Sequence, residues 1–147
     1  GEGPFVAEYF GDKGERLRKL GAEYGVATGR PRRVGPFDVV ASRYGIRCQG
    51  ANEIALTKLD VLSDYEEIEI CTAYTRDCKK IEEFPTTAIL GECKPVLETV
   101  KGWHTDISKK KDLPKEALDY IAYIEKACGC KIKYVSVGPE REAYVKL

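Results

Sequence analysis

The segment Leu113–Gly138, L-P-K-E-A-L-D-Y-I-A-Y-I-E-K-A-C-G-C-K-I-K-Y-V-S-V-G, decides the fold class. Pro114 suits the start of a helix and Gly129 its end. Between them the apolar residues recur with the period of a helix that buries one face; they are Ala117, Tyr120, Ile121, Ile124 and Cys128. Lys131–Val137 then has the composition of a strand and runs into the turn Gly138-Pro139. A helix that leads directly into a strand predicts an α/β fold.

The rest of the chain alternates between short helices and strands in the same way. Lys13–Leu20 is predicted to be a helix closed by Gly21, and Asp38 is predicted to cap a second helix that extends to Gln49. The apolar face of the second helix would carry Val40, Ala41, Tyr44 and Cys48. Further strands are predicted at Glu53–Leu59, Glu67–Thr75, Lys79–Phe84, Glu92–Thr99 and Ala143–Lys146.

Two of these strands predict an antiparallel hairpin. Glu67–Thr75 alternates, with Ile68, Ile70, Thr72 and Tyr74 on one face and Glu67, Glu69 and Cys71 on the other, as a half-buried strand does. The turn Arg76-Asp77 connects it to Lys79–Phe84. We therefore expect one α/β domain over residues 1–147, with a mixed sheet and antiparallel additions.

Composition excludes several classes of protein. Lys+Arg and Asp+Glu both number 24, so the chain lacks the basic excess that phosphate neutralisation requires of most nucleic-acid binders. The apolar runs are too short to cross a bilayer, and no signal peptide opens the sequence. We expect a cytoplasmic protein that binds neither membrane nor nucleic acid. Its six scattered cysteines indicate buried free thiols, since they do not have the spacing of a zinc site.

The beginning of the sequence indicates more protein upstream. The chain contains no Met, and Gly1 opens a stretch typical of the interior of a protein. We expect an N-terminal portion to precede it.

Thr57-Lys58-Leu59-Asp60 follows a predicted strand and is the first candidate binding segment. A carboxylate such as Asp60 can accept hydrogen bonds from both N1 and N2 of guanine, while the methylene stem of Lys58 covers the base. Adenine lacks both donors, and a site of this kind rejects such analogues by about 10⁴-fold. A solvated charge pair at a strand end would have the same sequence.

Gly25–Arg33, G-V-A-T-G-R-P-R-R, is the second candidate. Gly25 and Gly29 permit positive φ, and Arg30 and Arg32 can face one ligand from an extended loop. Guanidinium groups match carboxylates and phosphates, so a small dicarboxylic acid would suit the loop. An exposed basic loop without a ligand, and contact with RNA, are the alternatives.

Ser136-Val137-Gly138 is the third candidate. A serine hydroxyl and free backbone amides at the end of a strand can contact the edge of a base. The same residues occur in many ordinary turns.

Taken in order, these segments resemble the C-terminal part of the adenylosuccinate synthetase family. The resemblance covers essentially the whole chain. It also includes Gly1–Phe5, Cys71–Tyr74, Ile81–Pro85, Glu92–Val96 and Lys101-Gly102-Trp103. It implies part of a P-loop-like, GTP-dependent ligase fold and an enzyme that joins L-aspartate to IMP in AMP biosynthesis.

The resemblance also implies roles for particular residues. The guanine of GTP would be held by Lys58, Leu59, Asp60, Ser136, Val137 and Gly138. The aspartate loop would consist of Val26, Ala27, Thr28, Gly29, Arg30, Pro31 and Arg32, with Arg30 also touching IMP and Arg32 reaching GTP. Ala27 stands where the family usually has a threonine.

The catalytic parts of such an enzyme are expected outside this chain. By the resemblance, the phosphate loop, the catalytic aspartate and histidine and the Mg²⁺ ligands precede Gly1, so the chain alone is expected to be inactive. The complete enzyme would be a homodimer. His104, the only histidine, is interpreted as a surface or packing residue and Lys109–Lys111 as a solvated face. The alternative function is a stand-alone guanine-nucleotide-binding or regulatory module without catalysis.

Overall fold

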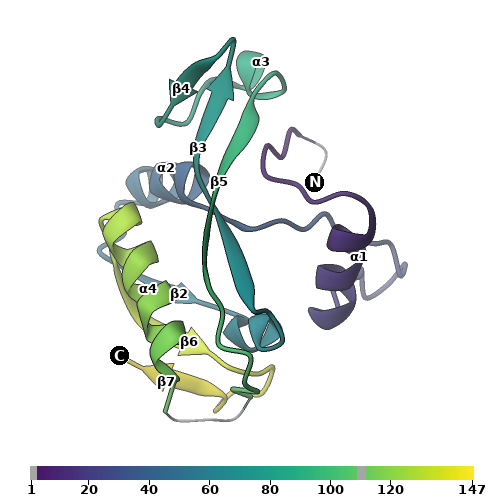
Figure 1. Cartoon of the computed structure of the whole chain (residues 1–147), viewed down its shortest axis with the longest axis vertical. Helices are drawn as coiled ribbons and strands as arrows, with labels where there is room; N and C mark the ends of the chain where they lie inside the picture. Colours follow the sequence, from purple (N-terminus) through teal and green to yellow (C-terminus); the bar gives the residue numbers. More distant parts are fainter. Residues whose placement is uncertain (1–2, 109–111) are drawn as a thin grey trace. The chain divides into compact units, whose positions relative to one another are not determined.

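The structure is a computed structural model that describes residues 3–108 and 112–147, so residues 109–111 lie outside the description. It divides into two compact units, one made of Gly1–Ala41 with Glu69–Glu98 and the other of Ser42–Ile68 with Thr99–Leu147. Figure 1 labels the elements, which in chain order are α1 (Gly11–Leu20), β1 (Phe37–Asp38), α2 (Val39–Gln49), β2 (Glu53–Leu56), η1 (Leu59–Leu62, a 3₁₀ turn), β3 (Glu67–Arg76), β4 (Lys79–Ile81), α3 (Thr87–Leu90), β5 (Lys94–Lys101), α4 (Lys115–Cys128), β6 (Lys131–Ser136) and β7 (Tyr144–Lys146).

The second unit is a sheet in the order β2-β6-β7 with α4 packed against β6 (Figure 1). β2 and β6 are parallel, with Leu56 opposite Val135, whereas β6 and β7 are antiparallel. All five residues of the predicted stripe on α4 are buried, and Gly129 ends the helix in the left-handed conformation, with φ 65°. The prediction for this segment is therefore confirmed.

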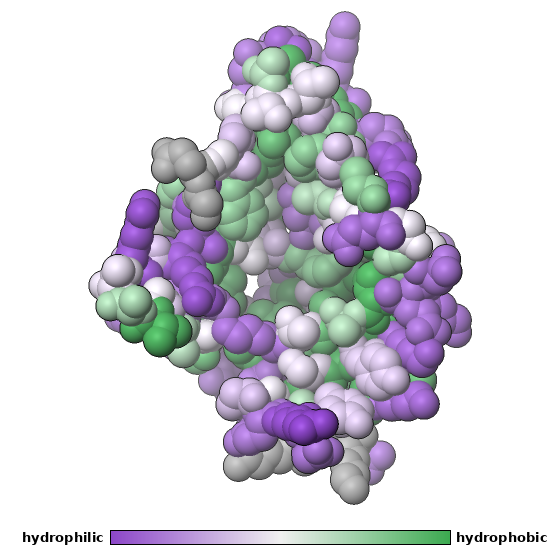
Figure 2. Space-filling view, turned by 180° about the vertical axis from the view of Figure 1, so that it is seen from behind, coloured by the Kyte–Doolittle hydropathy of each residue, from purple (hydrophilic) through white to green (hydrophobic). Residues whose placement is uncertain are grey.

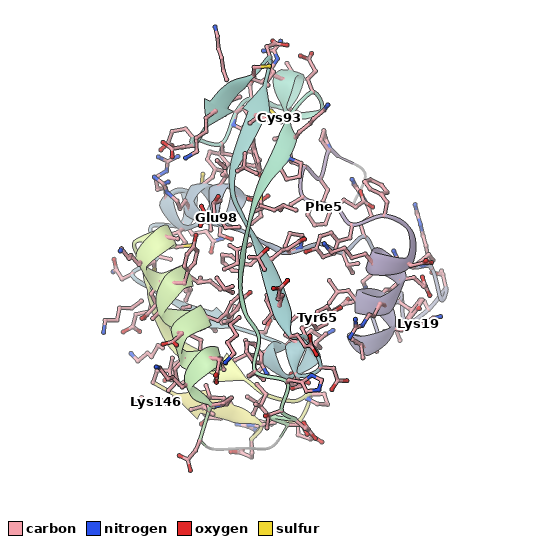
Figure 3. The ribbon with its side chains drawn as sticks, in the orientation of Figure 1. Phe5, Lys19, Tyr65, Cys93, Glu98 and Lys146 are labelled. Atoms are coloured by element: carbon pink, nitrogen blue, oxygen red, sulfur yellow. The ribbon has the colours of Figure 1, made fainter. Side chains whose placement is uncertain are left out.

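Gly102 allows an unusually close backbone approach in the same unit. A Cβ at this position would lie 1.9 Å from the carbonyl oxygen of Tyr65, which Figure 3 labels. The Gly102 amide also donates to the Glu66 carbonyl oxygen at 2.7 Å. The next residue, Trp103, is buried and meets the ring of Tyr120 edge-on at 5.9 Å. Only glycine permits this approach, so the Gly-Trp pair fixes the chain beside α4.

The first unit is built around β3, which pairs with β1, β4 and β5. The predicted hairpin is present, but its turn is Asp77-Cys78 and not the predicted Arg76-Asp77, because Arg76 still belongs to β3 and pairs with Lys79. Both turn residues have positive φ. The predicted exposure of one face of β3 is wrong at Cys71, because this side chain is fully buried. Its burial raises the pKa of the Cys71 thiol to about 12, with a smaller contribution from the charge of Asp38.

The core of this unit gathers side chains from distant parts of the sequence. Its buried members are Ala7, Val40, Cys71, Tyr74 and Leu90, and the partly buried residues packed against them are Phe5, Val6, Ile81, Phe84 and Cys93. The predicted cap of α2 is confirmed, since the Ala41 amide donates to Asp38 Oδ1 at 3.0 Å. The other oxygen, Oδ2, accepts a 2.6 Å hydrogen bond from the Tyr74 hydroxyl. Asp38 therefore connects the start of α2 to β3.

Two predictions about exposure are wrong. On α2 the predicted apolar face is not continuous, because Tyr44 is 44% exposed and Cys48 is exposed as well. All six cysteines are free thiols, as predicted, but only Cys71, Cys128 and Cys130 are buried. Cys78 is exposed because it lies in the β3–β4 turn. The 3.6-residue pattern of α2 thus overestimates how much of the helix is covered in this chain.

We predict that Tyr74→Phe lowers the free energy of unfolding by about 1–3 kcal/mol, because Asp38 Oδ2 loses its buried donor. Urea denaturation of this chain measures the difference. Tyr144→Phe is the matched control, since it removes the hydroxyl of a tyrosine that is 47% exposed. Equal stabilities for the two variants would contradict a stabilising role for the Asp38–Tyr74 contact.

Candidate functional site

The carboxyl ends of β2 and β6 bring two of the three predicted segments together. Because these strands are parallel, the residues that follow them emerge at the same edge of the sheet, where ligands bind in many α/β folds. The Lys58 amide donates to Ser136 Oγ at 2.8 Å, which joins segments 78 residues apart. The structure therefore places Thr57–Asp60 beside Ser136–Gly138.

Asp60 has a carboxylate oxygen that lacks a partner. It lies in η1 and not at a strand end, since β2 already ends at Leu56 and not at the predicted Leu59. Leu59 is buried and anchors the turn in the unit. Within residues 3–108 and 112–147, Asp60 Oδ1 is buried without any hydrogen-bond partner. Leaving such an acceptor unsatisfied costs free energy, so the position is suited to a ligand that brings a donor.

Of the free backbone amides predicted for the turn after β6, the Val137 amide is occupied and, among the described residues, the Gly138 amide is not. The Val137 amide donates to the Ala143 carbonyl oxygen at 2.9 Å and is therefore occupied. No hydrogen bond of the Gly138 amide is present in the described part of the chain. A Cβ on Gly138 would lie 3.0 Å from both Ala143 Cβ and Glu140 Oε2, so the turn is tight. Gly138 is thus the residue of this turn with a backbone donor to offer.

The arginine loop in the other unit is a hairpin, whereas the sequence predicted an extended loop. Its arms are joined by a bridge between Tyr24 and Pro31 and by a hydrogen bond from the Gly25 amide to the Arg30 carbonyl oxygen at 2.8 Å. Gly29 has φ 64°, as predicted, whereas Gly25 is not at positive φ. Val26, Ala27 and Thr28 form the exposed tip.

Two residues that sequence reasoning missed hold the base of this hairpin. Glu23 bonds to Arg32 twice, by a backbone hydrogen bond and by an ion pair from Oε2 to Arg32 Nη1, both at 2.9 Å. Arg18, on α1, donates from Nε to the Arg32 carbonyl oxygen at 2.9 Å. An acidic residue just before an arginine-rich glycine loop is a signal that could have identified Glu23.

The hairpin borders an open groove of about 790 Å³. Its lining includes Phe5, labelled in Figure 3, and Thr28, Arg30, Pro31, Arg32 and Arg33. Arg33 is held by an ion pair with Glu8 at 2.6 Å, and Arg32 is held by Glu23. Among the described residues, the Arg30 guanidinium has no hydrogen bond or ion pair. The groove therefore presents one uncommitted guanidinium group beside two neutralised ones, which suits a small anion.

The remaining predictions about this surface concern metals, histidine and membranes. Residues 3–108 and 112–147 contain no cluster of three or more His, Cys, Asp or Glu that could hold a metal ion. His104 is exposed, in line with its interpretation as a surface residue. Much of the face in Figure 2 is hydrophilic, and in the described residues no helix is long and apolar enough to span a bilayer.

Comparison with known proteins identifies the family. A family model described as adenylosuccinate synthetase matches residues 1–145. The chain belongs to the adenylosuccinate synthetase family. The synthetases of Aquifex aeolicus and Pelobacter propionicus are 46% and 47% identical to it over 151 aligned residues and are matched by the whole chain. The chain spans 35% of the length of each of these relatives.

A solved structure of the fully ligated adenylosuccinate synthetase from Plasmodium falciparum is also similar. The TM-score is 0.91 at 36% sequence identity, and the match covers all of this chain and 37% of the Plasmodium chain. The predicted α/β fold with mixed parallel and antiparallel strands agrees with this likeness to a synthetase.

We predict that Glu23→Gln loosens the arginine hairpin of this synthetase-family chain. Exposed ion pairs contribute about 0.2–1 kcal/mol, so the opened fraction should rise about 1.4- to fivefold. Limited trypsin digestion measures this as faster cleavage after Arg32 or Arg33, because Pro31 protects the Arg30 bond. Glu142→Gln, an exposed change outside the hairpin, is the control. Equal cleavage rates in the two variants would show that the Glu23 ion pair does not hold the loop.

Proposed function

We propose that this chain supplies guanine and aspartate recognition to an adenylosuccinate synthetase. The reaction is the GTP-dependent ligation of L-aspartate to IMP, which yields adenylosuccinate, GDP and phosphate in AMP biosynthesis. The observation that carries the proposal is the unpartnered Asp60 oxygen at the joined ends of β2 and β6, in a chain of this family.

Guanine is the base that this edge of the sheet suits best. Its N1–H and N2–H groups are adjacent donors, and together they would satisfy the Asp60 carboxylate. Its O6 atom is an acceptor that the free Gly138 amide can reach as donor. The methylene stem of Lys58 would lie against the base plane. The main chain at Leu59 and Val137 would border the base. Adenine would leave the carboxylate desolvated and unpaired, so we expect the site to discriminate against ATP.

The arginine hairpin is suited to L-aspartate. Arg30 has an uncommitted guanidinium group in the groove, and such a group can bind a carboxylate through two parallel hydrogen bonds. Thr28 lines the same groove and contributes a hydroxyl. By the family resemblance, Arg30 would also contact IMP and Arg32 would reach GTP. These residues act by orienting the amine of aspartate and neutralising charge, without transferring a proton.

Other properties of the synthetase are proposed from the family alone. The chain spans 35% of the length of its relatives, and by the family resemblance the metal ligands, the phosphate loop and the catalytic base would lie in another part of the enzyme. This chain would then be inactive by itself. We also expect the complete enzyme to be a cytoplasmic homodimer.

We predict that Asp60→Asn, in a full-length synthetase containing this chain, weakens GTP and favours xanthosine triphosphate, whose 2-oxo group accepts from an amide. The kcat/KM for GTP should fall by about 10²-fold or more. Steady-state kinetics with both nucleotides measures the change, and Asp119→Asn on α4 is the control. An unchanged nucleotide preference would refute the guanine assignment.

We predict that Arg30→Leu raises the KM for aspartate by about 10- to 100-fold and lowers kcat, because one charge-assisted carboxylate contact is lost. The KM for GTP should change little. Lys94→Leu removes an exposed cation of β5 and should leave both constants unaltered. If the aspartate KM of Arg30→Leu stayed at the wild-type value, the hairpin would not be an aspartate loop.

A further inference from the structure

Arg18, near the end of α1, is bonded to both arms of the arginine hairpin. Its carbonyl oxygen accepts from the Glu23 amide at 2.9 Å, in the arm that enters the loop. Its Nε atom donates to the Arg32 carbonyl oxygen, also at 2.9 Å, in the arm that leaves the loop. The hairpin lies beside α1 (Figure 1), so a single helical residue ties both arms to the helix.

The Arg18 side chain is itself held in place. Only 16% of it is exposed. Its Nη1 atom donates to Glu15 Oε2, one helical turn earlier, and the other oxygen of Glu15 accepts from the Tyr24 hydroxyl at 3.3 Å. Tyr24 belongs to the first arm, where it forms the bridge with Pro31. Arg18 is therefore part of a hydrogen-bonded network that begins and ends on the hairpin.

The position of the second arm matters because its side chains face the groove. Arg30 and Arg32 line the groove, whereas Arg18 does not. The main chain at Arg32 sets where both of these side chains begin, and the Arg30 carbonyl oxygen accepts from the Gly25 amide at 2.8 Å. A guanidinium group binds a carboxylate through two parallel hydrogen bonds, and both depend on direction. A small shift of this arm would therefore weaken anion binding without removing any group that touches the anion.

We propose that Arg18 is a positioning residue for aspartate binding, which donates from Nε to the Arg32 carbonyl oxygen and so fixes the arm that carries Arg30 and Arg32. This inference rests on the proposed function, because it requires that the hairpin binds aspartate. The Glu15 carboxylate offsets the charge of Arg18. We therefore expect Arg18 to contribute through its directed hydrogen bond and not through attraction of the anion.

The test uses a full-length synthetase containing this chain and two variants of similar side-chain reach. In Arg18→Gln the amide nitrogen takes the place of Nε in the side chain, so the donor to Arg32 is kept while the charge is lost. Arg18→Met has neither the donor nor the charge. We expect Arg18→Met to raise the KM for aspartate about three- to tenfold, and Arg18→Gln to stay within about twofold of the wild type.

Discrimination between bases should not respond, since Asp60 belongs to the other unit. The kcat/KM ratio of GTP to ITP, which lacks only the 2-amino group of guanine, should keep its wild-type value in both variants. Lys19→Met is the control, because it removes an exposed cation of the same helix, labelled in Figure 3, and should leave the aspartate KM unaltered. A purely structural role for Arg18 would lower the fraction of active enzyme, and hence kcat, at an unchanged KM.

Glu15→Ala is the second variant, since it removes the carboxylate that holds both Arg18 and Tyr24. It should raise the aspartate KM about two- to fivefold. An unchanged aspartate KM in the folded Arg18→Met or Glu15→Ala enzyme would overturn the proposal. Equal increases in Arg18→Met and Arg18→Gln would also overturn it, because they would trace the effect to the charge.

The effect of Arg30→Leu distinguishes this inference from the proposed function on which it rests. If Arg30→Leu raises the aspartate KM and Arg18→Met does not, only this inference fails. If neither variant changes the aspartate KM, the hairpin is not an aspartate loop and the proposed function fails with it.

Discussion

The parallel pairing of β2 with β6 is the constraint on which the candidate base site depends. The strands are brought into register with Leu56 opposite Val135, so the two segments that leave them are adjacent at one edge of the sheet. The pairing is supported by α4, whose apolar stripe packs over β6. Without this pairing, Asp60 and Gly138 would belong to unrelated loops. The hydrogen bond from Lys58 to Ser136 then fixes how the two loops meet.

Each unit carries a charged group that its own fold leaves unsatisfied. In one unit it is Asp60, a carboxylate with a buried free oxygen; in the other it is Arg30, a guanidinium group beside arginines that are already paired. Arg32 also stabilises the hairpin, because Glu23 and Arg18 both bond to it. A buried acceptor without a partner, such as Asp60 Oδ1, is unfavourable in the free protein and is satisfied when a complementary ligand binds. Arg30 is exposed, so water solvates its guanidinium group until an anion replaces that water.

The sequence predicted the features that arise from local pattern. The stripe of α4, its end at Gly129 and the Asp38 cap were all identified correctly, because helix periodicity and capping involve residues close together in the chain. Cys71 was assigned to an exposed face because an alternating sequence predicts a strand that is buried on one face only. In the structure both faces of β3 are buried at this point. The left-handed Lys58 could not be predicted, since its amide bonds to Ser136, a residue 78 positions away in the sequence. The two-fold bonding of Glu23 to Arg32 likewise depends on a hairpin that propensities do not specify.

The central claim is that the Asp60 carboxylate reads guanine at the joined strand ends. It is tested most directly by a crystal structure of a full-length synthetase containing this chain with GDP bound. The account predicts that the two carboxylate oxygens of Asp60 lie at about 2.7–3.2 Å from N1 and N2 of the base, with O6 facing the Gly138 amide. A base bound elsewhere, or one whose N1 and N2 face solvent while Asp60 Oδ1 stays unpartnered, would contradict it.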